Sequence, residues 1–361
     1  MELIKEIMKG TRGGNYYYVI EDSELVHISE YAIGKSCGKR ENEIIYEVSK
    51  DRLLGKIIYK FSFSRSGNFF LKKCRIEDFK NGHPEKCEQV DIDILGNLNL
   101  TFRTKNKNLN LLQKQFLELF IPMIDDLKAY EKSLSFNINF MGKARRVSSA
   151  YKDPKLYYFE FMSIPNDKGR INSLKVVRRW LYQLWILKLI CESLKVSKFK
   201  EPYYEGKSYW WIEQGSDHAA CIGETLFGDV SFWFEFQPTK GAHLMGLMTE
   251  KRVPIRPDIV IVKGHFEKTD KLIEEKPINL IIECKVDPFE RWKNEVEPQV
   301  LQYKKIFKPN KLIVVSLESV PDNIKGDLER EEIKTIDKLT PDSTSINMLN
   351  EFIQNYFNNF I

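Results

Sequence analysis

Residues 278–285 read INLIIECK and predict the strand on which the fold depends. Successive side chains of a strand point to opposite faces, so Glu283 and Lys285 share a face with Ile281. The run is largely apolar on both faces until its last three positions, which is typical of a central strand buried on both sides. Because buried charges are costly unless they are paired, Glu283 and Lys285 should lie at a cleft beside partners of their own.

A second apolar run, at residues 259–262, predicts a neighbouring strand that begins directly after Asp258. If the two strands pair, the carboxylate of Asp258 reaches the end of the first strand. A helix predicted at residues 297–307 carries Gln299 and Tyr303 four positions apart, and therefore on one face. The sequence thus predicts a site where five residues converge: Asp258, Glu283, Lys285, Gln299 and Tyr303.

The residue types at this predicted site suit a divalent cation and the hydrolysis of a phosphodiester. Asp258, Glu283 and the backbone carbonyl of Cys284 would supply oxygen ligands for Mg²⁺, for which Mn²⁺ could substitute. Such a cation lowers the pKa of a bound water and neutralises charge in the transition state. Lys285 could orient the attacking water, accept its proton if its own pKa were lowered, or stabilise a phosphate oxygen. Gln299 and Tyr303 could bind the phosphate or align Lys285.

Each of these features has an ordinary structural interpretation when it is taken singly. Glu-x-Lys on a strand is often an exposed ion pair, and Pro-Asp is common at turns. Their order favours a functional site, because Asp258 opens one buried strand and Glu283 closes another.

The pattern of predicted helices and strands divides the chain into two predicted domains, residues 1–150 and 170–361. The first alternates β-like runs with polar turns around one helical stretch near 111–127, which predicts a β-rich domain that binds substrate or a partner. The second opens with an amphipathic helix at about 173–194 and continues as a meander, strand, helix and strand. This order predicts a mixed α/β sheet flanked by helices. The basic segment 142–172 is the expected boundary.

The composition is ordinary for a globular protein, with 42% hydrophobic and 30% charged residues among 361. A net charge of +5 permits nucleic-acid binding without requiring it. Without a membrane-length apolar run or a signal-peptide pattern, we expect a cytoplasmic protein that contacts no membrane. The six cysteines are expected to be buried thiols, and the alternative is a zinc site formed by Cys37, Cys74, His83 and Cys87.

Residues from about 175 to 316 resemble the PD-(D/E)xK nuclease superfamily. Pro257-Asp258 and Glu283-Cys284-Lys285 match its signature, and Gln299-x-x-x-Tyr303 resembles the additional motif of its RecB-type branch. The resemblance implies a restriction-endonuclease-like fold and Mg²⁺-dependent cleavage of nucleic acid. The N-terminal half resembles no family that we can name.

A second likeness lies in the long helix, where residues 182–185 read YQLW. They resemble a Tyr-Glu-x-Trp pattern of the nuclease subunits of McrBC-like restriction systems. Such families supply an acid from this helix, whereas this chain has Gln183. An amide is a weaker metal ligand than a carboxylate, so another acid would have to substitute, and Glu192 and Glu235 are the candidates.

Basic residues near the predicted helices are candidates for contacts with nucleic-acid phosphates. They are Lys175, Arg178 and Arg179 at the long helix, and Lys304 and Lys305 after Tyr303. A solvated basic face is an equally good interpretation of these residues.

Three functions are compatible with these residues. The first is a Mg²⁺-dependent endonuclease or exonuclease acting on DNA. The second, for which Gln183 is the main argument, is a catalytically weakened nuclease-fold protein that binds nucleic acid or assembles with a partner. The third is an RNA-processing nuclease. Since the chain has no Walker motif, a restriction-like system would need a separate NTPase subunit, and the sequence also allows a homodimer.

Overall fold

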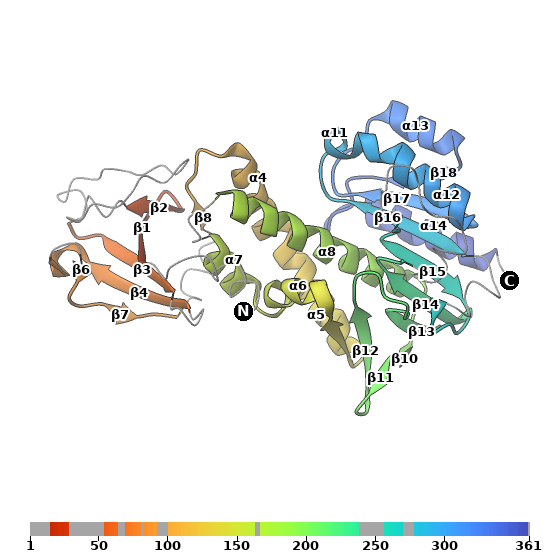
Figure 1. Cartoon of the computed structure of the whole chain (residues 1–361), viewed down its shortest axis with the longest axis horizontal. Helices are drawn as coiled ribbons and strands as arrows, with labels where there is room; N and C mark the ends of the chain where they lie inside the picture. Colours follow the sequence, from red (N-terminus) through yellow and green to blue (C-terminus); the bar gives the residue numbers. More distant parts are fainter. Residues whose placement is uncertain are drawn as a thin grey trace. The chain divides into compact units, whose positions relative to one another are not determined.

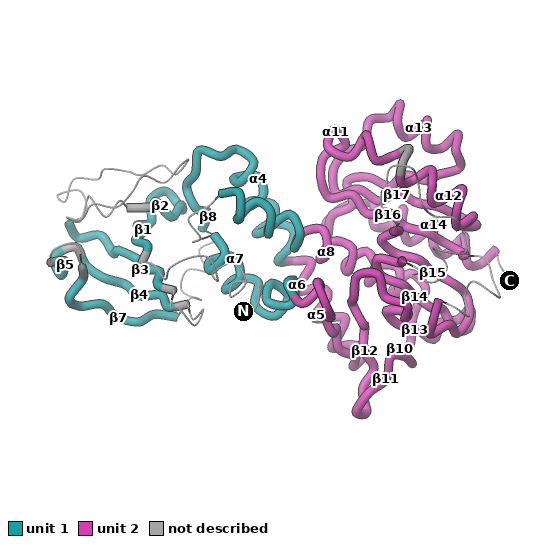
Figure 2. Tube along the Cα trace, viewed as in Figure 1, with its two compact units in different colours: residues 1–121, 146–177 teal, residues 122–145, 178–361 magenta. Residues whose placement is uncertain are grey.

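The computed structural model of the chain describes residues 15–28, 54–63, 69–80, 83–91, 100–162, 167–237, 256–269 and 278–359. The chain forms two compact units (Figure 2). Unit 1 comprises residues 1–121 and 146–177, and unit 2 comprises residues 122–145 and 178–361. The division at residue 178 falls inside one helix, α8 (Asp167–Ser193). The units therefore do not coincide with the ranges 1–150 and 170–361 expected from the sequence.

Unit 1 contains a six-stranded sheet with the strand order β7-β4-β3-β1-β2-β8 (Figure 1). Its strands are β1 (Asn15–Glu21), β2 (Glu24–Ile28), β3 (Ile57–Phe63), β4 (Phe69–Arg75), β7 (Glu88–Gln89) and β8 (Thr101–Phe102). Strand β1 pairs antiparallel with both β2 and β3. Asp22 and Ser23, both at positive φ, form the two-residue turn between β1 and β2. The buried side chains of Tyr17, Val19 and Ile58 contribute to the core of this sheet.

Helices follow the sheet in the sequence: α4 (Lys107–Gln115), a π-helical segment (Phe116–Phe120), α5 (Ile121–Ser133), α6 (Arg145–Lys152) and α7 (Pro154–Met162). The expected boundary segment 142–172 is therefore mostly helical. Its sequence contains an overlooked start signal, because Pro154 opens α7 and the Asp153 carboxylate accepts a hydrogen bond from the Leu156 N–H at 2.9 Å.

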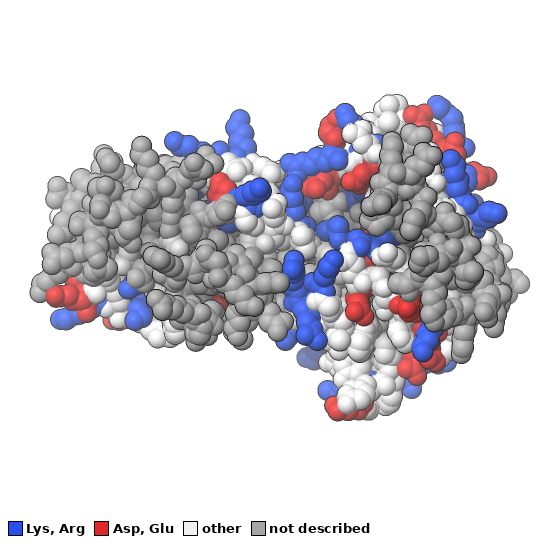
Figure 3. All heavy atoms as spheres, viewed as in Figure 1, with Lys and Arg blue, Asp and Glu red and all other residues white. Residues whose placement is uncertain are grey.

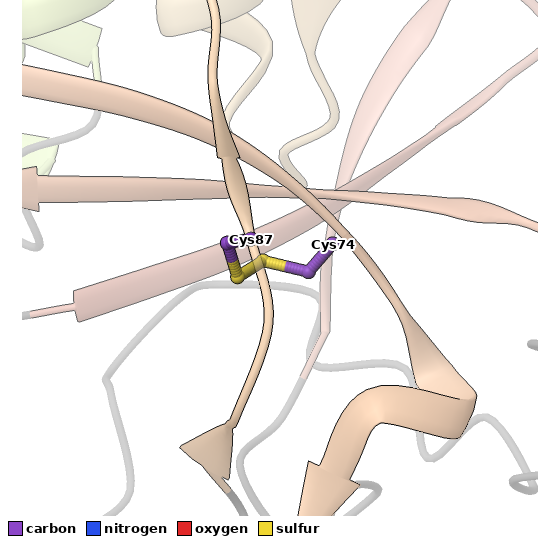
Figure 4. The surroundings of a disulfide bond; sticks show 2 residues. All are labelled: Cys74 and Cys87. Atoms are coloured by element: carbon purple, nitrogen blue, oxygen red, sulfur yellow. A yellow bond between two sulfur atoms is a disulfide. The ribbon is translucent and has the colours of Figure 1, made fainter.

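A disulfide joins Cys74 and Cys87 in unit 1 (Figure 4). The expectation of buried thiols is wrong for this pair, and a zinc site that uses both as thiolates is excluded in the oxidised form. Strand β4 pairs with β7, so the two cysteines approach one another as the chain returns through the hairpin of β5 (Phe79–Lys80) and β6 (His83–Pro84). Cys37 and the side chain of His83 lie outside the described residues. Cys191, Cys221 and Cys284 are buried free thiols, as predicted.

Unit 2 is built on a seven-stranded sheet with the order β10-β13-β14-β15-β16-β17-β18. The strands are β10 (Lys198–Glu201), β13 (Cys221–Thr225), β14 (Gly228–Phe234), β15 (Ile259–Lys263), β16 (Leu280–Lys285), β17 (Lys311–Ser316) and β18 (Ile333–Ile336). Pairing is antiparallel from β10 to β16 and parallel from β16 to β18. All six residues of β16 are buried, as the sequence predicted for a central strand. A smaller sheet contains β9 (Phe136–Phe140), β11 (Tyr203–Tyr204) and β12 (Lys207–Ile212).

The helices of unit 2 complete a mixed α/β architecture, which confirms the predicted fold class at this level. After β16 come α11 (Phe289–Trp292), a 3₁₀ turn (Lys293–Glu295), a π-helical segment (Val296–Leu301) and α12 (Gln302–Phe307). Helices α13 (Asp322–Arg330) and α14 (Ser345–Asn358) follow. Trp292, Val300 and Tyr303 pack with Val260 and Ile281 of the sheet in one apolar cluster. Within the described residues, no helix is both long and apolar enough to cross a membrane.

Candidate active site

Asp258 and Glu283 meet at the ends of two paired strands. Strands β15 and β16 are antiparallel with Ile259 opposite Ile282, so one further step of the register sets Asp258 opposite Glu283. The Oδ2 atom of Asp258 accepts a hydrogen bond from the backbone N–H of Cys284 at 2.7 Å. Both carboxylates are buried. The strand pairing inferred from the apolar runs thus brings the two acids together.

Lys285 lies beside these acids in a nearly closed environment. Its Nζ atom is 2.9 Å from Glu283 Oε1 and 2.7 Å from Glu295 Oε2. It also donates to Gln299 Oε1 at 3.4 Å and stands 5.7 Å from the centroid of the Trp292 ring. Burial lowers the pKa of Lys285, but the charges of Glu283, Glu295 and Asp258 outweigh this effect and raise it above its usual value. Lys285 is therefore an ammonium ion at neutral pH, which argues against the general-base role considered from the sequence.

The environment of Asp258 disfavours its charged form. Burial raises the pKa of Asp258 well above its usual value, and the charges of Glu283 and Glu235 raise it further. Lys285 and Arg179 partly offset this rise. Binding of a cation here would favour the charged form of Asp258, so the acid and the cation would stabilise one another.

Gln183 occupies the position at which the related pattern has an acid. From α8 it donates to Asp258 Oδ1 at 2.5 Å, so the amide touches the acid pair directly. The two acids predicted to substitute for it, Glu192 and Glu235, lie in different environments. Glu192 forms an ion pair with Lys188 at 2.8 Å one turn away on α8, and it remains partly exposed. Glu235 is fully buried and follows the end of β14, where its N–H donates to the Asp258 carbonyl at 2.7 Å.

Gln299 and Tyr303 reach the same site from the segment after β16. Tyr303 donates to the backbone carbonyl of Arg256 at 3.0 Å, two residues before Asp258. The predicted single helix is in fact a π-helical segment followed by α12. Pro298 has no N–H to donate, which favours such a local change of helix type. The structure thus gathers all five predicted catalytic residues in one region of unit 2.

The predicted phosphate contacts lie in different environments, some buried or paired within the protein and others exposed. Arg178 is buried, with Nη2 3.5 Å from the Val286 carbonyl and Nη1 3.8 Å from Asp287. Lys304 bonds the Glu331 carbonyl at 2.5 Å and Glu332 at 3.2 Å. Arg178 and Lys304 therefore have partners within the protein. Lys175 lies in the part of α8 that belongs to unit 1, and Lys305 is exposed on α12. On the drawn face of unit 2, basic and acidic atoms are interspersed (Figure 3).

Residues without a predicted role also belong to the site. Glu295 is the closest partner of Lys285, and the Trp292 ring faces the ammonium group of Lys285. Arg256 contacts Glu235 at 3.3 Å, and Arg179, which was predicted as a phosphate contact, lies 2.9 Å from the same carboxylate. The one signal for Arg256 in the sequence is its position next to Pro257-Asp258, and nothing local links Glu295 to Lys285.

Buried polar atoms without a hydrogen-bond partner gather here. They include Gln183 Oε1, Glu235 Oε2, Glu283 Oε2 and Arg256 Nε, of which Glu235 Oε2 has only an ion-pair contact with Arg256. Such atoms are rare in folded proteins, and an ion, a water molecule or a ligand commonly accounts for them. Three of these four atoms are oxygens, the donor type that Mg²⁺ prefers.

A divalent cation fits this set of donors only with help from groups other than carboxylates. Within the described ranges, no group of three or more His, Cys, Asp and Glu side chains is arranged to hold a metal ion by itself. Asp258 and Glu283 supply two carboxylates, and the amide oxygen of Gln183 is a third oxygen beside them. The chemistry of these donors suits a hard cation that keeps several waters. Comparison of the chain with protein-family models, with curated proteins and with solved structures gave no match.

Proposed function

We propose that unit 2 is a restriction-endonuclease-like domain that hydrolyses phosphodiester bonds of DNA with the help of Mg²⁺ or Mn²⁺. The observation that carries the proposal is the convergence of Asp258, Glu283 and Lys285 at the ends of two interior strands of a mixed sheet. Two buried acids beside a buried lysine are unusual for a purely structural position.

Asp258 and Glu283 are the groups that would hold the cation, together with the backbone carbonyl of Cys284 and the amide oxygen of Gln183. When bound, the cation supplies an acidified water and neutralises charge on the phosphate. The Cys284 N–H fixes the Asp258 carboxylate, which limits the reorganisation needed for binding.

Lys285 acts as a fixed positive charge in this scheme. Its bonds to Glu283 and Glu295 set the position of Nζ, and its ammonium group can donate to a water or to a phosphate oxygen. Gln299 adds a third contact that holds Nζ in place. Tyr303 anchors the chain before Asp258 through the Arg256 carbonyl, so its role is to position the acid.

A catalytically weakened protein that binds nucleic acid is the second candidate, and the contact of Gln183 with Asp258 favours it. A neutral amide takes the place where an additional carboxylate would strengthen cation binding. The bond at 2.5 Å also occupies one oxygen of Asp258.

Cleavage assays separate these candidates. Purified protein is incubated with linear, circular, single-stranded and branched DNA and with labelled RNA, with Mg²⁺, Mn²⁺ or a chelator, in parallel with Lys285→Met. Cleavage of DNA that needs the cation and Lys285 supports the proposal, and preferred cleavage of RNA transfers it to RNA processing. Folded protein that binds DNA and cleaves none of the substrates supports the weakened protein instead.

A further inference from the structure

Glu235 is a fully buried carboxylate that contacts two arginines. Its Oε1 atom lies 2.9 Å from Arg179 Nη2, and its Oε2 atom lies 3.3 Å from Arg256 Nη2. The arginines come from distant parts of the chain, since Arg179 belongs to α8 and Arg256 precedes β15. Both reach the surface, with 44% and 18% of their side chains exposed, whereas Glu235 has no exposed surface.

We propose that Arg179 and Arg256 form a phosphate-binding site beside Asp258, and that Glu235 is the positioning residue that orients both guanidinium groups. The ligand class is the phosphodiester group of a nucleic-acid backbone. The assignment of the ligand as DNA rests on the proposed function, whereas the anion site itself rests on the contacts around Glu235.

The donors of the two arginines support an anion site. A guanidinium carries five N–H donors in a planar fork, and one contact with Glu235 leaves most of them for another acceptor. The Nε atom of Arg256 is buried without a hydrogen-bond partner among the described residues. Each contact of Glu235 is to a single Nη2 atom, so it uses part of each guanidinium and leaves the Nη1 and Nε donors for another acceptor.

The charges around Glu235 leave part of the arginine charge for another partner. Two arginines contact this one carboxylate, so Glu235 neutralises only one of them, and the charge of Arg179 also acts on Asp258. Glu235 lies next to Asp258 through the bond of its N–H to the Asp258 carbonyl at 2.7 Å. A phosphate bound by these arginines would therefore lie close to the two acids, where cleavage is proposed.

The same contacts show why Glu235 is a poor candidate for the missing metal ligand. Each of its oxygens faces a guanidinium, so a cation there would have to displace an arginine and meet like charge. Its backbone is in the left-handed region, with φ at 46°. This conformation is uncommon for a non-glycine residue. The chain nevertheless stays beside the segment that precedes β15, because the Phe236 N–H donates to the Pro257 carbonyl at 2.9 Å.

The test measures binding of a labelled DNA duplex in a chelator, over a range of salt concentrations. Removing one side chain that neutralises a phosphate lowers the slope of log affinity against log salt by about 0.9. Arg179→Gln and Arg256→Gln are each expected to show this smaller slope together with weaker binding. Arg330→Gln is the matched control, because Arg330 is an exposed arginine of the same unit that pairs with Asp327 at 2.7 Å.

Glu235→Asp tests positioning separately from charge. It keeps the negative charge, and aspartate tolerates the left-handed backbone, but its side chain is too short to hold both arginines. Several-fold weaker binding is expected, whereas a residue that only neutralises charge would leave binding unchanged. Thermal denaturation shows whether the single arginine variants fold. If they do not, the double variant Arg179→Gln with Glu235→Gln removes the positive and the negative charge together, and the same decrease in slope is expected.

Wild-type protein that binds no DNA, or folded arginine variants with the wild-type salt slope, would overturn the phosphate site. Cleavage with Mg²⁺ is recorded in the same preparations. A smaller slope without any cleavage retains the phosphate site and rejects the nuclease. Cleavage together with an unchanged slope retains the nuclease and rejects the phosphate site.

Discussion

The carboxylate of Asp258 accepts a hydrogen bond from the backbone N–H of Cys284 at 2.7 Å. This bond ties the residue before β15 to the end of β16, between Glu283 and Lys285. The two acids and the ammonium group are therefore held by the sheet itself and not by a loop. Sites built on rigid elements keep their geometry better than sites on loops.

Replacing Lys285 with methionine is expected to lower DNA cleavage about 10²–10³-fold, the usual effect of removing one group that stabilises developing charge. It also leaves Glu283 buried without its cation, so the free energy of unfolding should fall by about 3–5 kcal/mol. Cleavage rates and urea denaturation measure the two effects. Lys293→Met is the control, because Lys293 forms an exposed ion pair with Glu290 at 2.7 Å. Equal cleavage by both variants would remove Lys285 from the mechanism.

Replacing Gln183 with glutamate tests the cation site without any assay of activity. A third carboxylate beside Asp258 should destabilise the metal-free protein, and Mn²⁺ should then raise the melting temperature more than in wild type. Gln113→Glu is the matched control, since Gln113 is also buried and bonds both the N–H and the carbonyl of Phe102. A response to Mn²⁺ that is the same in all three proteins would show that the acids do not bind the ion.

The sheet and the acid pair could be predicted because they follow from local patterns. The apolar runs around residues 259–262 and 278–282 identify two buried strands, and pairing them places Asp258 and Glu283 together. The alternation of a strand then assigns Lys285 to the same face as Glu283.

The partners of these residues could not be predicted, because they depend on contacts between distant segments. Arg178 was expected on a solvated or phosphate-binding face, yet α8 is buried on most sides around it and the guanidinium turns inward to Val286 and Asp287. The contact of Glu235 with two arginines needs a left-handed backbone at residue 235, which no periodicity indicates. Glu295 contacts Lys285 from the 3₁₀ turn that follows α11, and a change of helix type at that point is not visible in the periodicity of the sequence.

The disulfide between Cys74 and Cys87 should stabilise unit 1. The two residues are 13 apart in the sequence, and closing a loop of this length contributes about 3 kcal/mol. The variant with serine at both positions is therefore expected to unfold more readily, as is wild type in dithiothreitol. Amide hydrogen exchange in β3 and β4 measures the effect. Dithiothreitol should not change the exchange of the serine variant, and an effect there would mean that the reductant acts elsewhere.

Glu160 of α7 should make the stability of unit 1 depend on pH. Burial raises the pKa of this carboxyl from 4.5 to about 7, and the charge of Asp153 adds to the rise. The folded protein then binds more protons than the unfolded chain between these values, so this contribution is fully present below about pH 4.5 and is lost as the pH rises through about 7. The difference between these two pKa values corresponds to about 3 kcal/mol in the free energy of unfolding. Glu160→Gln should flatten the profile and stabilise the protein at pH 8.

Denaturation of wild type and Glu160→Gln at pH 5 and pH 8 measures this difference. Glu118→Gln is the control, because Glu118 belongs to the same unit and is exposed, with Lys114 4.0 Å away. The control should shift the free energy of unfolding equally at both pH values. If Glu160→Gln stabilises the protein at pH 8 no more than Glu118→Gln does, the prediction is wrong. Ionisation of Glu160 in the folded protein would then be opposed neither by burial nor by the charge of Asp153.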